Sequence, residues 1–387
     1  MIFQRSPIEI NPRLGATLDF LRWTSALAVL AGHVRMFLFP PMESIGHAWI
    51  PLNTFYLVTG FGNQAVMVFF VLSGFLVGGR AAEKLSEGTF RMGDYMADRV
   101  SRLYPVFFVG LLLTATLDSF GMNLFYNANC YKSTYPMLRD LVNYNMGSQL
   151  SIVTFLSNLL MLQGIVTPSF GTNGPLWSLS MEFWYYILFP LLLIPFYARA
   201  ARVRWTSIGI LVLVLCLLAM NPNYYALFVV WLLGVAARRL HFPFRNSSVA
   251  FGLLALTLVN SRIGFGPSYL RDLVIGVGCM LVIVSVHNGG GGIACGAALS
   301  KKMANFSYSL YCCHFPIVVF SVAILASRRD VSMLSMQSRF LIAAALTTFC
   351  LCASYGISLF TEAKTAFFRN RLKSVMPAAI RATPKPC

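Results

Sequence analysis

Apolar segments long enough to cross a lipid bilayer recur along almost the whole of this 387-residue chain. A helical crossing takes about 20 residues. Hydrophobic residues make up 57% of the chain and charged residues 11%, more apolar surface than a water-soluble domain of this size can bury. The sequence therefore predicts an all-α polytopic membrane protein with ten transmembrane helices. The expected spans are 14–38, 62–80, 103–120, 176–197, 205–221, 223–238, 247–262, 269–287, 305–327 and 340–361.

The basic residues predict how these spans are oriented. Cytoplasmic loops of membrane proteins are enriched in Lys and Arg, and placing both termini in the cytoplasm puts most of the 30 basic residues on that side. A further apolar stretch, 150–165, is shorter and carries Ser, Asn and Gln; counting it as a crossing moves the majority outside. We therefore expect 150–165 to be a re-entrant or interfacial segment and 81–102 to be a basic cytoplasmic loop. The net charge of +17 fits contact with anionic membrane lipids, and no nucleic-acid partner is expected.

Two polar side chains share one face of the first expected span. Arg22 and His33 are eleven residues apart, which is about three helical turns and roughly 16 Å along the axis. Asp19 lies about one turn before Arg22. Ionisable groups inside a membrane are costly and commonly functional, although a lone histidine is as often satisfied by a neighbouring helix. An imidazole that titrates near neutral pH is suited to take a proton from a hydroxyl group.

Arg99 and Arg102 are three residues apart and share a face where the third span begins. From charge alone, ordinary cytoplasmic anchoring is the favoured interpretation. The alternative is a clamp for phosphate groups, because guanidinium forks match phosphate oxygens. Pro105 is expected to fix the start of this helix.

Glu182 lies in an otherwise apolar span, with Ser178 four residues earlier on the same face. A carboxylate there is unfavourable unless it is paired. The predicted orientation gives Glu182 a depth comparable with that of His33. Our hypothesis is that Glu182 orients or charge-pairs with that imidazole.

Four further residues are candidates for substrate contact or support. Tyr308 and Tyr311 fit an interfacial aromatic belt, and His314 fits either packing or a functional role. Ser73, followed by glycine, indicates first a contact between helices through small residues. The nine cysteines show no metal-ligand spacing, so no metal is expected.

Five motifs occur in an order that resembles the acyltransferase-3 family of integral membrane O-acyltransferases. They are LDFLR with a histidine eleven residues after its arginine, VFFVLSGFL, RVSRLYP, LWSLSMEFWYYILFP and SYSLYCCHFPI. The resemblance covers about residues 14–361. It implies one domain over 1–387 with its core in 14–361, no soluble hydrolase-like domain, and a basic cytoplasmic tail over 362–387.

The resemblance also implies an activity: transfer of an acyl group from cytoplasmic acyl-CoA to a hydroxyl of a glycan at the bacterial inner membrane. The acceptor would be a sugar of a lipopolysaccharide O-antigen, an exopolysaccharide, peptidoglycan, a lipo-oligosaccharide signal, a macrolide or a lipid-linked glycan. Polysaccharide-assembly proteins are candidate partners. Acetyl is the usual acyl group; succinyl is the alternative and would call for another cation such as Arg35. Departures from the family pattern are Asp98 before Arg99, where arginine is common, and Cys313 before His314, where tryptophan is common.

Roles follow by motif position. His33 matches the essential histidine and Arg22 its basic partner, Arg99 and Arg102 match the pair thought to hold coenzyme A, and Ser178 and Glu182 match W-S-L-x-x-E. The coenzyme would dock at the arginines, and its thioester would reach His33, by direct transfer or through an acyl-imidazole. Two alternatives remain open: a sugar transporter, and an acyl carrier that serves a separate transferase.

Overall fold

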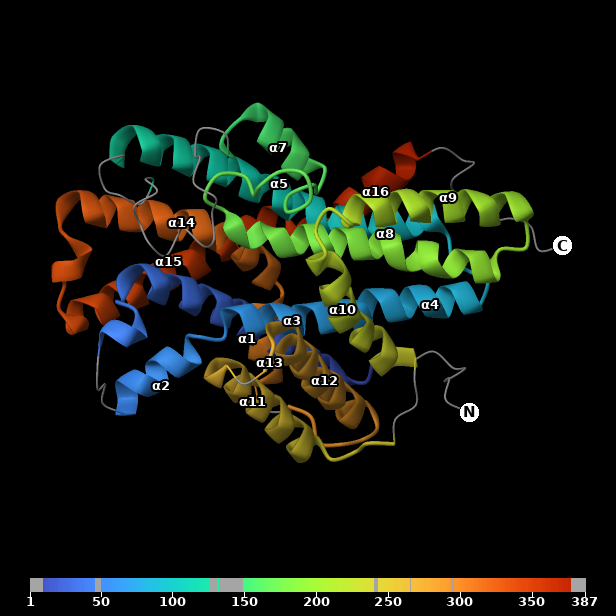
Figure 1. The fold of residues 1–387 in the computed structure, drawn as a ribbon, viewed down its shortest axis with the longest axis horizontal. Helices are drawn as coiled ribbons and strands as arrows, with labels where there is room; N and C mark the ends of the chain where they lie inside the picture. The colour runs from blue at the N-terminus through green and yellow to red at the C-terminus, as the bar shows by residue number, and fades with distance from the viewer. Residues whose placement is uncertain are drawn as a thin grey trace.

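The computed structural model describes residues 10–45, 50–125, 131, 149–239, 243–264, 266–293 and 296–376, and within these ranges the chain is built from α-helices (Figure 1). Eight helical stretches are long and apolar enough to cross a membrane. This confirms an all-α polytopic membrane protein. Each of the ten expected spans corresponds to a helix. The two expected spans that are not among these eight stretches are α10 and α11, which are shorter, at 17 residues each.

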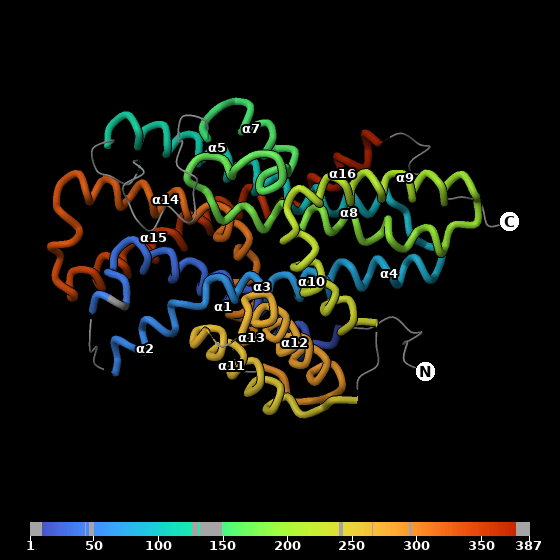
Figure 2. The backbone as a smooth tube through the Cα atoms, in the orientation of Figure 1, coloured from blue at the N-terminus to red at the C-terminus, as the bar shows by residue number. Residues whose placement is uncertain are grey.

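The main helices follow the order of the expected spans. They are α1 (Pro12–Leu38), α3 (Gly62–Ser73), α5 (Met92–Phe125), α8 (Trp177–Tyr197), α9 (Ala201–Leu218), α10 (Asn223–Arg239), α11 (Ser247–Ile263), α12 (Ser268–His287), α14 (Ser307–Arg328) and α15 (Met336–Phe360). Shorter helices are α2 (Ile50–Val58), α4 (Gly79–Ser86), α7 (Ile152–Leu159), α13 (Ala297–Ala304) and α16 (Thr365–Val375). Figure 2 shows α3 and α4 as one rod through the middle of the view, with α5, α8 and α9 above it and α11 and α12 below.

The expected cytoplasmic loop over 81–102 is largely helical rather than irregular chain, which corrects its expected conformation. Helix α4 continues to Ser86, and α5 begins at Met92, with Pro105 inside it rather than at its start. Charged residues lower the hydropathy of these turns without preventing a helix from forming. The tail is also partly helical: Lys373 in α16 lies 3.0 Å from Asp98 of α5. Residues 377–387 of the expected tail lie outside the described residues.

A one-turn π-helix, η2 (Gly74–Gly78), joins α3 to α4 and crosses α10 at very close range. A Cβ added at Gly74 would lie 1.9 Å from the carbonyl oxygen of Trp231, and one at Gly234 would lie 2.0 Å from that of Val71. Glycine is therefore required on both helices, because no side-chain atom fits between the two backbones. The expected contact through small residues after Ser73 is confirmed.

We predict that Gly74→Ala lowers stability by about 1–3 kcal/mol, because the added methyl group must push two backbones apart. Thermal unfolding in detergent measures this. Gly209→Ala in α9 is the matched control, since a Cβ there meets nothing within 4 Å. An equal loss in both variants would show that the tight crossing is not the cause.

Helix α7 has eight residues and is therefore about 12 Å long, too short to cross a bilayer. This agrees with the expected re-entrant or interfacial segment. Residues 163–176, which are irregular up to the short 3-10 helix η4 (Gly174–Leu176), are here called the inserted segment. Its buried Asn173 donates to the carbonyl oxygen of Cys312 in α14 at 2.9 Å. That oxygen lacks its helical donor because Pro316, four residues later, has no N–H.

A buried acid completes the attachment of the inserted segment. Asp118 of α5 accepts from the backbone N–H of Thr172 at 2.6 Å and from its hydroxyl at 2.9 Å. Non-helical backbone at membrane depth is tolerated only where protein groups satisfy it. Asp118 and Asn173 do so, and they fix the inserted segment between α5 and α14.

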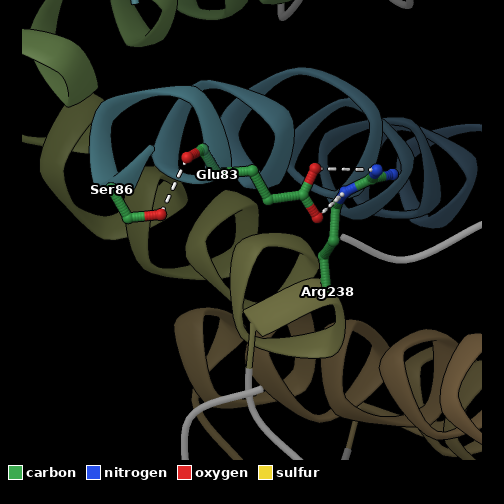
Figure 3. A network of polar contacts seen from close by, with 3 residues as sticks. All are labelled: Glu83, Ser86 and Arg238. Atoms are coloured by element: carbon green, nitrogen blue, oxygen red, sulfur yellow. Dashed lines mark hydrogen bonds and ion pairs between the residues drawn. The ribbon is translucent and has the colours of Figure 1, made fainter. Parts of the chain in front are cut away.

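Glu83 of α4 and Arg238 of α10 form a buried ion pair (Figure 3). Nε of Arg238 donates to Oε1 of Glu83 at 2.8 Å, and a second guanidinium nitrogen donates to Oε2 at 3.0 Å. The side chains are only 4% and 7% exposed. Arg238 thus binds α10 to α4 rather than serving only as a basic residue at a membrane surface.

Candidate active site

A cavity of about 230 Å³ lies among α1, α3, η2, α5, α8 and α14. Its polar lining comes from segments that are far apart in the sequence. It comprises Arg22, Arg99 and Arg102, the acid Glu182, and the hydroxyls of Ser73, Ser178, Tyr186, Ser307, Tyr308 and Tyr311. Of the eleven site residues expected from the sequence, eight therefore share one cavity.

The three arginines give the cavity a positive wall. Arg22 lies 3.8 Å from Asp19, the neighbour expected from the sequence. Among the described residues, neither Arg99 nor Arg102 forms an ion pair, and the buried Nε of Arg99 has no hydrogen-bond acceptor. The guanidinium of Arg99 lies 5.9 Å from the ring centres of both Tyr95 and Tyr186, which restrict its position. Buried donors without acceptors are costly, so this wall is suited to an anionic ligand.

A chain of hydrogen bonds ends on the carboxylate of Glu182. The indole N–H of Trp231 donates to Ser73 at 3.1 Å, Ser73 lies 3.1 Å from the hydroxyl of Tyr186, and that hydroxyl donates to Glu182. Indole can only donate, so the donors run from Trp231 toward the acid. The structure does not pair Glu182 with His33 as hypothesised. The hydrogen-bond donor to the carboxylate of Glu182 is Tyr186.

The other hydroxyls on the cavity wall also donate to protein oxygens. Tyr308 donates to the carbonyl oxygen of Leu103 at 3.1 Å, and Tyr311 donates to that of Pro175 at 2.9 Å. The hydroxyl of Ser178 lies 2.6 Å from that of Tyr311 and 3.4 Å from the same carbonyl oxygen of Pro175. These contacts attach α14 to α5, α8 and the inserted segment. Among the described lining residues, the hydroxyl groups therefore already have protein acceptors, and the guanidinium groups are the donors that a ligand could use.

His33 lies beyond this lining, against α14. Its Nδ1 is 2.8 Å from Nε2 of His314, and the ring of Phe315 meets it edge-on with centres 4.8 Å apart. His314 is fully buried and its ring centre is 6.2 Å from that of Tyr311, which does line the cavity. The structure thus places His314 next to the cavity wall and His33 in contact with His314.

Sequence reasoning missed Tyr186 and Asn173. Tyr186 follows Glu182 by four residues on the same helical face, so the spacing could have revealed it. Asn173 gave no local signal, because its acceptor is 139 residues away. Among the described residues, no group of three or more His, Cys, Asp or Glu side chains could hold a metal ion.

Comparison with known proteins identifies related chains. A family model described as an acyltransferase domain matches residues 16–359. An uncharacterized protein of Haemophilus influenzae is 30% identical over 165 residues, which are 41% of this chain and 61% of that protein. Acyltransferase MdmB of Streptomyces mycarofaciens is 30% identical over 206 residues, 52% of this chain and 45% of that enzyme. The chain thus spans about half the length of these curated relatives, and no solved structure matches it.

Proposed function

Because the chain belongs to the acyltransferase-3 family of membrane acyltransferases, we propose that it transfers an acyl group from acyl-CoA to a hydroxyl of a cell-surface or exported glycan. The observation that carries this proposal is the cavity wall of Arg22, Arg99 and Arg102. Coenzyme A presents a diphosphate, and guanidinium groups are the side chains best matched to phosphate oxygens. The cytoplasmic donor would enter from the side on which α5 begins.

The spacing on α1 supports a pantetheine thioester as the donor. Arg22 and His33 are separated by roughly 16 Å along the helix axis. About 13 covalent bonds join the inner phosphorus of coenzyme A to its sulfur, and an extended chain advances about 1.1–1.2 Å per bond, so that arm reaches roughly 15 Å. A diphosphate held at the arginines would thus bring its thioester close to His33.

The proposed chemistry begins with His33 as the base. Its imidazole takes the proton from the acceptor hydroxyl while the oxygen attacks the thioester carbonyl. The carbon–sulfur bond then breaks, and the imidazolium returns the proton to the departing thiolate. An acyl-imidazole formed first on His33 would give the same products in two steps.

We propose acetyl as the acyl group and the bacterial inner membrane as the location. Arg35, the cation expected to serve a succinyl carboxylate, lies 5.1 Å over the ring of Tyr56. It is not among the residues that line the cavity. The acceptor is proposed to be a glycan or lipid-linked glycan.

The test combines two measurements. Surface glycans from cells with and without the full chain are compared by mass, and an added acetyl group on one sugar is the expected difference. Purified protein in lipid bilayers, given labelled acetyl-CoA and the glycan so identified, should then label it without a second protein. Label that never reaches the glycan unless another transferase is added would overturn the proposal in favour of an acyl carrier.

We predict that the double variant Arg99→Gln with Arg102→Gln raises the KM for acyl-CoA by about 10–100-fold, because two charge-assisted bonds to phosphate are lost. Titration of the purified protein with coenzyme A gives the same comparison without an acceptor. Arg80→Gln is the control, since Arg80 is an exposed cation on α4. Unchanged coenzyme A binding in the double variant would contradict the proposed donor site.

A further inference from the structure

His33, which is partly buried, and His314, which is fully buried, form an in-plane hydrogen bond rather than a stacked pair. Their ring planes differ by 12° and their centres are 5.1 Å apart, while the Nδ1 of His33 and the Nε2 of His314 are 2.8 Å apart. Each nitrogen of an imidazole lies about 1.1 Å from its ring centre, given C–N bonds near 1.33 Å. These lengths add up to the distance between the centres, so both nitrogens lie on the line that joins the rings. One proton must therefore lie between them.

The contacts of the other ring nitrogen of His314, Nδ1, indicate which of the two rings carries the shared hydrogen. Nδ1 of His314 lies 2.8 Å from the carbonyl oxygen of Leu310 and 2.9 Å from that of Tyr311. Carbonyl oxygens only accept, so Nδ1 of His314 carries a hydrogen. The ring is fully buried, and no carboxylate among the described residues pairs with it, which favours the neutral form. A neutral imidazole protonated at Nδ1 has a lone pair at Nε2.

From this geometry we infer that His314 is a positioning residue that holds His33 in the tautomer with its hydrogen on Nδ1 and its lone pair on Nε2. His314 accepts the Nδ1 hydrogen of His33, and Phe315 limits rotation of the ring. The inference rests on the proposed function for the chemistry that Nε2 performs. The inference gives α14 a positioning role, while the base, His33, comes from α1.

The proton balance of the proposed transfer follows from this arrangement. Nε2 of His33 takes the proton of the acceptor hydroxyl, and the ring becomes an imidazolium that keeps its Nδ1 hydrogen bond to His314. When the carbon–sulfur bond breaks, Nε2 returns the proton to the thiolate and the pair is restored. His314 itself gains and loses no proton in the cycle.

Two substitutions of His314 separate positioning from packing. A glutamine can place its amide oxygen close to the position of Nε2 and accept the same hydrogen bond, whereas leucine cannot accept one. We expect His314→Leu to lower kcat by at least about 10²-fold, because the wrong tautomer leaves no base facing the substrate. His314→Gln should retain activity within about 10-fold of the unaltered protein, and the KM for acetyl-CoA should change by less than about 2-fold in both.

Nitrogen-15 spectra of the full chain in lipid bilayers, labelled at histidine, test the tautomer directly and need no turnover. A His33→Gln spectrum assigns the signal, and His287→Gln is the control, since His287 ends α12 away from the cavity lining. The expected result is a protonated Nδ1 on His33 that becomes a mixture in His314→Leu. A protonated Nε2 on His33 of the unaltered protein, or equal loss of activity in the leucine and glutamine variants, overturns the inference. An inactive protein with the expected tautomer would instead refute the proposed function alone.

Discussion

Replacing His33 by glutamine is expected to lower the rate of acyl transfer by about 10²–10⁴-fold, the usual contribution of a general base. The affinity for coenzyme A should change little, because the arginines that would hold the phosphates line a cavity whose described lining does not include His33. The effect should therefore fall on kcat. An acyl-imidazole route would make the loss at least as large, because the nucleophile itself would be missing.

Single-turnover transfer from labelled acetyl-CoA and equilibrium binding of coenzyme A measure the two quantities separately. His287→Gln is the matched histidine control, expected to leave both unchanged. Transfer that continues undiminished in His33→Gln would exclude this residue as the base. Loss of coenzyme A binding together with transfer would show instead that His33 holds the donor or supports the fold.

Arg238→Met is expected to reduce the free energy of unfolding by about 3–5 kcal/mol, because it leaves the carboxylate of Glu83 buried without a counter-charge. The remaining acid is 7% exposed and cannot turn into solvent without moving α4. Methionine keeps most of the apolar stem that packs on Gly79. The loss would therefore be electrostatic.

A double-mutant cycle in detergent, followed by thermal unfolding, isolates this effect. Adding Glu83→Leu to Arg238→Met should restore most of the lost stability, since the uncompensated charge disappears. Arg239→Met, one residue along α10, should stay within about 0.5 kcal/mol of the unaltered protein. If the double variant is no more stable than Arg238→Met alone, lost packing is the cause rather than the unpaired acid.

Apolar length was enough to predict the helices, because the bilayer leaves a spanning backbone little other choice. The start of α5 was missed for the converse reason: Asp94, Asp98 and Arg99 lower the hydropathy of turns that are nonetheless helical. Hydropathy indicates which part of a helix can lie in lipid. It does not indicate where a helix begins beyond the lipid.

Most residues of the candidate site were predicted from the sequence, but which of them contact one another was not. Depth along the membrane normal gave Glu182 and His33 similar positions, and depth does not say which helices are neighbours. In the structure α1 packs against α3 and α14, so His33 meets His314. Glu182 instead accepts from Tyr186 of its own helix, α8. The ion pair of Glu83 and Arg238, which are 155 residues apart, likewise could not be predicted without knowing which helices are neighbours.

The attachment of the inserted segment also orders the events of synthesis. Asn173 finds its acceptor on Cys312, which is made 139 residues later. At about 5–20 residues per second, the ribosome needs roughly 7–28 s to reach it. During that interval the segment has its contact with Asp118 of α5 but none with α14, and the wall beside the histidines is incomplete. The cavity wall that α14 supplies, with Tyr308 and Tyr311, is therefore added only after the walls from α1, α3, α5 and α8 have been synthesised.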